Sequence, residues 1–249
     1  MPRTAKIYVS LIISSGAAVL LIAAGAWSSA SLPQFVTLLG FAGVSSTLKI
    51  RIPGLESTVS PNFIFLLLAM LCCSFSEVAA IALVAALVQS LWAAKRPRLI
   101  QVAFSAAALV LSATVAFQSA RLLLGSSSSI SPLVLAILAG TLYLPLNTAL
   151  ISAVIGLVEG RPSVEVARIC YEYVFPYFMG GLLFTGMVSG AFSRSTIWQG
   201  AVVLFPVAVL GYLYFLNRIP TLTPAQFQSA NLLAEDKGLV GVGSGRHSR

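Results

Sequence analysis

Long apolar runs without alternation are the feature that most limits what this chain can fold into. The first, Ile7–Trp27, is long enough as a helix to cross the roughly 30 Å hydrocarbon core of a bilayer. Hydrophobic residues make up 58% of the chain and charged residues only 9%, whereas a soluble domain is about one quarter charged. A membrane β-barrel would show alternating apolar residues instead. The pattern therefore predicts an all-α fold, a polytopic transmembrane helical bundle.

About eight such runs predict eight spans, in a transmembrane bundle over residues 1–220. A polar tail over residues 221–249 is expected to be disordered. The Ser-Ser-Ala at residues 28–30 resembles a cleavage site, but the first apolar run is longer than that of a signal peptide, which favours a retained span. Residues 61–92 fit a tight helical hairpin, with one broken helix or a re-entrant pair as alternatives. The predicted spans are Ile7–Trp27, Pro33–Leu48, Pro61–Phe75, Glu77–Trp92, Ile100–Leu124, Ile130–Val158, Tyr173–Phe192 and Ile197–Asn217.

The positive side chains predict the orientation of the bundle. Lys and Arg residues gather in the cytoplasmic loops of membrane proteins. With eight spans, all 15 Lys and Arg residues except Arg121 and Arg194 lie on one side of the bilayer. This asymmetry predicts that both termini, and the polar tail, are cytoplasmic.

The remaining composition excludes several classes of function. The net charge of +8 comes from basic residues in small groups between apolar runs, so it reflects topology and not binding to nucleic acid. Cys72, Cys73 and Cys170 lie in or beside apolar runs, and the one histidine, His247, lies in the tail. We therefore expect no disulfide framework, no metal, no cofactor, no catalytic residues and no enzyme activity.

Two polar residues in the sixth apolar run are candidates for a small-molecule ligand site. Asn147 and Thr148 follow Pro145, where we expect a kink in the helix. A polar side chain at this depth is expected to face protein and not lipid. Ligand contact is one interpretation of Asn147, and a hydrogen bond between helices is the other.

The fourth apolar run supplies two further ligand candidates, Gln89 near its end and Glu77 at its start. Glu77 is expected near the outer surface, where a carboxylate costs little. The alternative role for Glu77 is helix capping, because Ser74 or Ser76 can begin a new helix and an acidic residue is favourable in its first turn.

A charged elbow follows the sixth run and contains Glu159 and Arg161. Pro162 ends the sixth helix, because proline lacks an N–H and disfavours a helix at the residue before it. Ser163 can then cap a new helix.

We predict that this new helix is short and lies on the cytoplasmic interface. Glu165, Arg168 and Glu172 are three and four residues apart, so they share one face. Pro176 would then turn the chain back into the membrane. We expect the elbow and this helix to be where a signal leaves the bundle; the alternative is a solvated row of ion pairs that only orients the helix.

The order of features between residues 144 and 181 resembles a known family. An Asn-Thr pair, a Glu-Gly-Arg elbow, an acidic residue beside an aromatic one and a Pro-Tyr pair follow one another. Here these are Asn147-Thr148, Glu159-Gly160-Arg161, Glu172-Tyr173 and Pro176-Tyr177. With Leu48–Gly54 and Ser60–Phe63, they resemble the multi-span N-terminal membrane-associated sensor domains of bacterial HD-GYP and GGDEF signalling proteins, over residues 30–217.

The resemblance implies a sensor module in the bacterial inner membrane. Such proteins continue into a cytoplasmic domain that makes or breaks cyclic di-GMP, and no HD, GYP or GGDEF sequence occurs here. We therefore expect a non-catalytic module that binds a small ligand and signals to a separate cytoplasmic protein. The alternatives are the substrate-binding subunit of an energy-coupling-factor-like transporter, a helical bundle of similar size, and a scaffold without a ligand.

Overall fold

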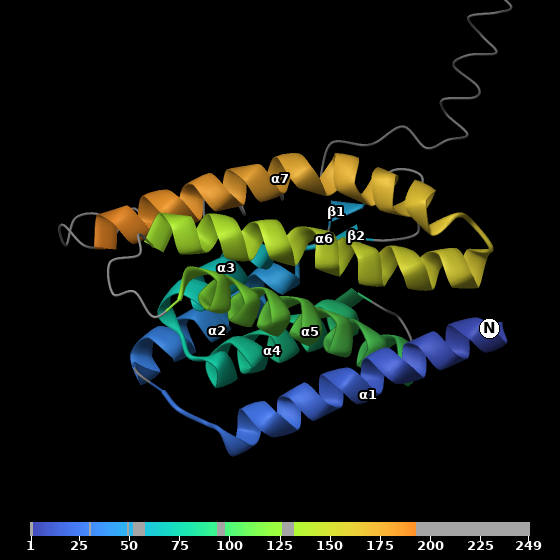
Figure 1. The fold of residues 1–249 in the computed structure, drawn as a ribbon, viewed down its shortest axis with the longest axis horizontal. Coiled ribbons are helices and arrows are strands. Elements are labelled where there is room, and N and C mark those ends of the chain that lie inside the picture. Colours follow the sequence, from blue (N-terminus) through green and yellow to red (C-terminus); the bar gives the residue numbers. More distant parts are fainter. Residues whose placement is uncertain are drawn as a thin grey trace, which may run out of the picture. The chain divides into compact units, whose positions relative to one another are not determined.

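Seven helices and one two-stranded ladder make up the part of the chain that the structure describes (Figure 1). The structure is a computed structural model and describes residues 2–29, 31–48, 50–51, 58–93, 98–125 and 132–192. The elements in chain order are α1 (Arg3–Gly25), α2 (Leu32–Ser46), β1 (Ile50–Arg51), β2 (Thr58–Val59), α3 (Phe63–Cys72), α4 (Phe75–Ala93), α5 (Leu99–Leu124), α6 (Pro132–Glu159) and α7 (Ser163–Phe192). The predicted eighth span, Ile197–Asn217, and the tail lie outside the described residues.

Four helices are long and apolar enough to cross a membrane: Arg3–Gly25, Phe75–Trp92, Leu99–Leu124 and Val134–Glu159. Large apolar side chains such as Leu21 are exposed on their outer faces, a surface that suits lipid and not water. The prediction of a helical membrane protein is confirmed at this level. Eight spans with both termini in the cytoplasm remain a prediction.

Helix α3 is shorter than the sequence suggested. We predicted a span over residues 61–75, but the helix runs only from Phe63 to Cys72. Ten residues rise about 15 Å, half of a hydrocarbon core, so α3 by itself is shorter than a span and the predicted helix bounds are wrong. The first residues of α3 lie beside the last turns of α4, as the hydrogen bond from Asn62 to Gln89 requires. The predicted tight helical hairpin is therefore confirmed.

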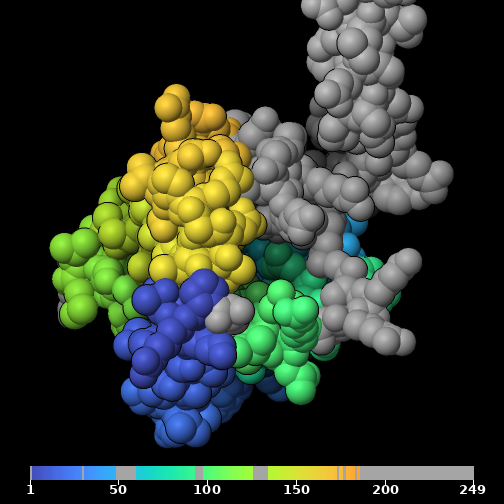
Figure 2. Space-filling model, turned by 90° about the vertical axis from the view of Figure 1, so that its right-hand side faces the viewer, coloured from blue at the N-terminus to red at the C-terminus, as the bar shows by residue number. Residues whose placement is uncertain are grey.

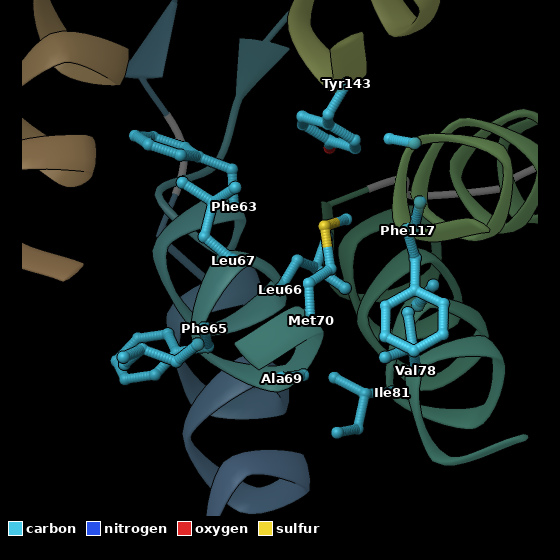
Figure 3. Packing of buried hydrophobic residues seen from close by; sticks show 14 of the residues in the cluster. Phe63, Phe65, Leu66, Leu67, Ala69, Met70, Val78, Ile81, Phe117 and Tyr143 are labelled. Carbon is cyan, nitrogen blue, oxygen red and sulfur yellow. The ribbon is translucent and has the colours of Figure 1, made fainter. Parts of the chain in front are cut away.

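The short helix α3 forms the centre of the hydrophobic core. It is apolar all round and almost entirely buried, as expected for a helix surrounded by other helices. It packs against α2, α4, α6 and α7. Figure 3 shows Leu66 and Met70 of α3 turned towards Ile81 of α4 and Phe117 of α5, with Tyr143 of α6 nearby.

The small ladder is a departure from the all-α prediction. Ile50 pairs with Val59, and Arg51 pairs with Thr58, in antiparallel register. The predicted Pro53-Gly54 turn falls between the two strands, outside the described residues.

The starts of α1 and α5 and the end of α6 meet at one end of the bundle. The Tyr8 ring lies 6.2 Å from that of Phe104, and the Tyr8 hydroxyl donates to the Leu150 carbonyl at 3.2 Å. Figures 1 and 2 show the start of α1 beside the turn that joins α6 to α7. Arg3 and Arg161 therefore lie at the same end, as their predicted sidedness requires.

Helices approach most closely at glycines that the sequence did not single out. A Cβ at Gly16 of α1 would lie 2.6 Å from the Cβ and 2.7 Å from the Cα of Ala107 in α5. Gly40 and Gly43 of α2 also suggest close helix approach by sequence, but such a Cβ would have nothing within 4 Å at either, so that suggestion is wrong. Small residues let backbones approach where no side chain intervenes.

We predict that Gly16→Ala destabilises the bundle. The new methyl group would force α1 and α5 apart, at a cost of about 1–3 kcal/mol in the free energy of unfolding. Gly40→Ala is the matched control: it meets no neighbour and should leave stability unchanged or raise it by up to about 1 kcal/mol. Thermal unfolding of both variants in detergent measures the difference. Equal midpoints would contradict the close α1–α5 contact.

The orientation is tested by epitope tags inserted at Gly125 and at Gly160. These glycines follow α5 and α6, two consecutive helices that run in opposite directions, so they lie at opposite ends of the bundle. We expect the tag at Gly160 to be cytoplasmic and the tag at Gly125 to be accessible from outside. Protease protection in spheroplasts shows on which side of the membrane each tag lies. Tags on the same side would contradict the proposed topology.

Candidate functional site

The four candidate ligand residues do not form one pocket. Glu77 lies in the first turn of α4, and Gln89 lies about 18 Å further along the same helix. Asn147 and Thr148 lie on α6. The structure thus separates Glu77 from Gln89 and surrounds each with partners that sequence reasoning missed.

Gln89 belongs to a buried polar cluster that we call the amide network: Ser46, Ser60, Asn62 and Gln89. The side-chain Nδ2 of Asn62 donates to Ser46 Oγ at 3.1 Å and to Gln89 Oε1 at 3.2 Å. The Ser60 hydroxyl donates to the Ser46 carbonyl at 3.3 Å, and the Ser46 hydroxyl donates to the Ala42 carbonyl at 2.6 Å. Asn62 is only 4% exposed. The network therefore connects α2, α3 and α4 through polar side chains inside an apolar bundle.

Three helix ends place the amide network. Ser46 ends α2, Asn62 precedes α3, and Gln89 lies in the last turns of α4. By sequence, Ser60 followed by Pro61 suggests a cap and a first helical residue, but the carbonyl of Asn62 accepts from Phe65 and Leu66, so the helix begins two residues later. The signal that we overlooked was an asparagine directly before a wholly apolar helix, a residue type that favours helix starts.

Glu77 forms a reciprocal capping box with Ser74. Its Oε2 accepts from the Ser74 N–H at 2.8 Å, and its own N–H donates to Ser74 Oγ at 3.3 Å. This is the S-x-x-E arrangement that satisfies two unpaired donors at a helix start. The capping role predicted as the alternative for Glu77 is therefore present, with Ser74 as its partner.

Glu77 also fastens the α1–α2 connection to α4. Ser29 donates to Glu77 Oε1 at 2.6 Å, and the Ser74 hydroxyl donates to the Ser28 carbonyl at 2.6 Å. Ser76 reaches the Ala26 carbonyl at 2.9 Å. Glu77 is 1% exposed, so other residues shield its carboxylate from water. Its expected position near the outer surface of the membrane stays a prediction. Both carboxylate oxygens are used within the protein.

Asn147 and Thr148 lie on α6 after Pro145, and the helix continues through that proline. Thr148 is buried, whereas Asn147 is half-buried. Neither side chain has a hydrogen-bond partner among the residues that the structure describes. That Asn147 faces the bundle interior stays a prediction.

The elbow is a tight turn between two long helices. Gly160 has a φ of 71°, the left-handed conformation that commonly ends helices and that glycine adopts without strain. Arg161 donates to Glu165 at 2.8 Å and lies 3.9 Å from Glu159. The hydrogen bond to Glu165 and then the charge of Glu165 raise the pKa of Arg161 above its usual value.

The predicted interfacial helix is not separate. Helix α7 runs from Ser163 to Phe192 without a break at Pro176, so that prediction is wrong. Ser163 is not its cap either, because the Pro162 carbonyl accepts the N–H groups of Glu165 and Val166.

Charged residues cover only the first turns of α7. Arg168 donates to Glu172 at 2.9 Å in a second ion pair, and Arg168 is 80% exposed. This exposed pairing agrees with the row of ion pairs that we considered as the alternative. Three carboxylates and two guanidinium groups take part in these pairs, and none of the five side chains is buried.

Within the described ranges, no group of three or more His, Cys, Asp or Glu side chains could hold a metal ion. The three cysteines are free thiols. Chemistry at the amide network is therefore limited to hydrogen bonding.

No protein-family model, curated protein or solved structure matches this chain.

We predict that Glu77→Ala lowers the free energy of unfolding by about 1–3 kcal/mol, because it leaves the Ser74 N–H and the Ser29 hydroxyl without acceptors. Glu77→Gln keeps one carbonyl acceptor and should lose less. The control is Glu172→Ala, whose side chain is exposed and should change stability by less than about 1 kcal/mol. Thermal midpoints of the three variants measure this order. An unchanged thermal midpoint in Glu77→Ala would contradict a stabilising role for the hydrogen bonds that Glu77 accepts.

Proposed function

We propose that this chain is a non-catalytic sensor module of the bacterial inner membrane, with both termini in the cytoplasm. In this proposal it binds a small molecule at the amide network. Binding then changes the conformation of the bundle, and the α6–α7 elbow passes this change to a separate cytoplasmic protein. The resemblance of residues 30–217 to membrane-associated sensor domains of HD-GYP and GGDEF proteins points in the same direction.

The observation that carries the proposal is the position of the amide network at the start of a buried half-length helix. Interrupted helices inside membrane bundles put polar groups at a depth where small ligands bind. Here the side chain of Asn62, just before α3, donates hydrogen bonds to Ser46 of α2 and Gln89 of α4. A ligand that engages these side chains changes contacts among three helices at once.

A continuous set of contacts leads from the amide network to the elbow. Phe63 follows Asn62 in sequence, and its ring lies 5.6 Å from that of Phe178 in α7. A Cβ at Gly181 of α7 would collide with Phe63, so α3 and α7 are in close contact at that point. Because α7 continues unbroken from there to Ser163, a shift of α3 reaches the elbow along one helix.

The elbow lies where a soluble partner can reach it. Helix α6 has 28 residues and α7 has 30, about 42 and 45 Å, so both exceed the hydrocarbon thickness. Their shared end carries Glu159, Arg161 and Arg168, which prefer water. The exposed ion pairs would give a partner a hydrophilic surface.

Photo-crosslinking in native membranes tests the proposal. A crosslinking residue at Glu165, in the elbow, is compared with one at Leu122, at the opposite end of α5. We expect the elbow probe alone to enrich one soluble cytoplasmic protein. Enrichment of a membrane ATPase assembly instead would favour the transporter alternative, and equal labelling by both probes would refute the sensor proposal.

We predict that Arg168→Glu leaves folding nearly intact and weakens this crosslink. The pair with Glu172 is exposed, so its loss should cost less than about 1 kcal/mol. The control is Arg121→Glu, at the other end of the bundle, which should leave the elbow crosslink unchanged. If Arg168→Glu prevents membrane insertion or folding, the elbow is a structural joint and not a contact surface.

A further inference from the structure

Three cations lie at the end of the bundle where α1 and α5 begin, the end that faces the viewer in Figure 2. Arg3 and Lys6 belong to the first turns of α1, and Arg98 directly precedes α5. The ring contact between Tyr8 and Phe104 joins these two helix starts. Each cation is two to six residues before one of these rings, so it lies within about 10 Å of the contact along its helix axis.

The three side chains are exposed, and no carboxylate pairs with them within the part of the chain that the structure describes. Neither α1 nor α5 has an acidic residue in its first turn. The elbow at the same end does carry carboxylates, but each of them is paired with Arg161 or Arg168. Arg3, Lys6 and Arg98 therefore form a surface of uncompensated positive charge, which we call the cationic rim.

Apolar and aromatic side chains next to the cationic rim indicate where the membrane surface lies. Ile7 and Leu11 share one face of α1 and are exposed, and Leu99 at the start of α5 is 85% exposed. Trp92, near the end of α4, is 73% exposed, and tryptophan is enriched at membrane–water interfaces. Lys and Arg side chains extend their charged ends to the same level. The rim therefore lies at the depth of lipid headgroups, directly beside surfaces that suit acyl chains.

We infer that the cationic rim binds the headgroup of an anionic phospholipid, whose acyl chains lie against the exposed apolar side chains of α1 and α5. A lipid phosphate carries a negative charge that Lys and Arg donors bind through charge-assisted hydrogen bonds. A soluble phosphate lacks the second contact, burial of apolar surface, so the combination favours a lipid. This inference does not depend on the sensor proposal.

The bound lipid has a structural role at this position. Helix α1 is the least buried of the four helices that are long and apolar enough to cross a membrane. A headgroup shared by Arg3 or Lys6 of α1 and Arg98 of α5 would connect the two helix starts beyond the Tyr8–Phe104 contact. An anionic lipid therefore fastens a loosely packed helix to the centre of the bundle.

Quenching of tryptophan fluorescence by brominated lipids tests the inference at the site. One full-length chain keeps only Trp92, through Trp27→Phe and Trp198→Phe, and a second keeps only Trp27, which follows α1 and lies at the opposite end. Both are placed in nanodiscs of phosphatidylcholine. We expect brominated phosphatidylglycerol to quench Trp92 more strongly than the same amount of brominated phosphatidylcholine does. The two lipids should quench Trp27 equally.

Substitution of the rim in the Trp92 chain locates the headgroup. Arg3→Gln, Lys6→Gln and Arg98→Gln together should abolish the preference for phosphatidylglycerol, because each charge removed lowers the affinity about fivefold. The matched control, Arg3→Lys with Lys6→Arg and Arg98→Lys, keeps all three charges and should keep the preference. Arg121→Gln, near the other end of α5, should keep it too. The epitope tag at Gly160 verifies that each variant has the same orientation.

A salt series gives a second measurement that needs no substitution in the rim. Raising the salt concentration from about 0.1 M to about 1 M shortens the Debye length from about 10 Å to about 3 Å, so the preference at Trp92 should fall. The series therefore decides the question even where the neutral variant does not fold.

Four results would overturn the inference: equal quenching of Trp92 by the two lipids, the same preference at Trp27, a preference that survives in the folded neutral variant, or a preference that salt does not change. Soluble glycerol phosphate separates the two sources of phosphate. We expect it to leave the quenching of Trp92 by brominated phosphatidylglycerol unchanged. If it removes that quenching, the rim binds free phosphate and the assignment to a lipid is wrong.

Discussion

The requirement that polar groups be satisfied inside an apolar environment governs this structure. The start of α3 is buried, and Asn62 there donates to side chains of α2 and α4. The last residue of α3, Cys72, is exposed. Just after it, Ser74 and Glu77 begin the next helix and fasten it to the α1–α2 connection. The two polar clusters therefore lie at the two ends of one short helix.

Sequence patterns predicted those parts of the fold that depend on local chemistry. The apolar runs predicted most of the helices, and the serines before Glu77 indicated a helix start there without deciding between Ser74 and Ser76. The start of α3 was hard to place, because Ser60, Pro61 and Asn62 are all residue types that begin helices, and both Ser60 and Asn62 use their side chains to contact Ser46 of α2. The grouping of candidate ligand residues failed for a related reason: periodicity shows that Gln89 is polar in an apolar run but not which helix end it faces.

Pro176 was expected to turn the chain back into the membrane after a short helix, but α7 continues through it. A proline inside a helix removes one N–H and leaves the carbonyl about four residues earlier unpaired. In α7 that carbonyl belongs to Glu172, a residue with an exposed side chain in the charged first turns of the helix. The helix continues, and the elbow is fixed to the membrane bundle by one stiff element in place of a loosely hinged segment. In the proposed sensor, a signal that leaves at the elbow would move α7 as a whole.

Because α7 is one continuous helix, its packing against neighbouring helices limits how the elbow could move. Helix α7 can move only if its neighbours in the bundle permit it, and α3 touches it where Phe63 packs against Phe178 and Gly181. Packed interiors respond in discrete rearrangements and not by gradual deformation, because they are dense. A change in the hydrogen bonds of Asn62 would act on the adjacent Phe63, at the point of closest contact between α3 and α7. In the proposed sensor, α3 thus carries Asn62 of the amide network and contacts α7, one of the helices that reach the elbow end.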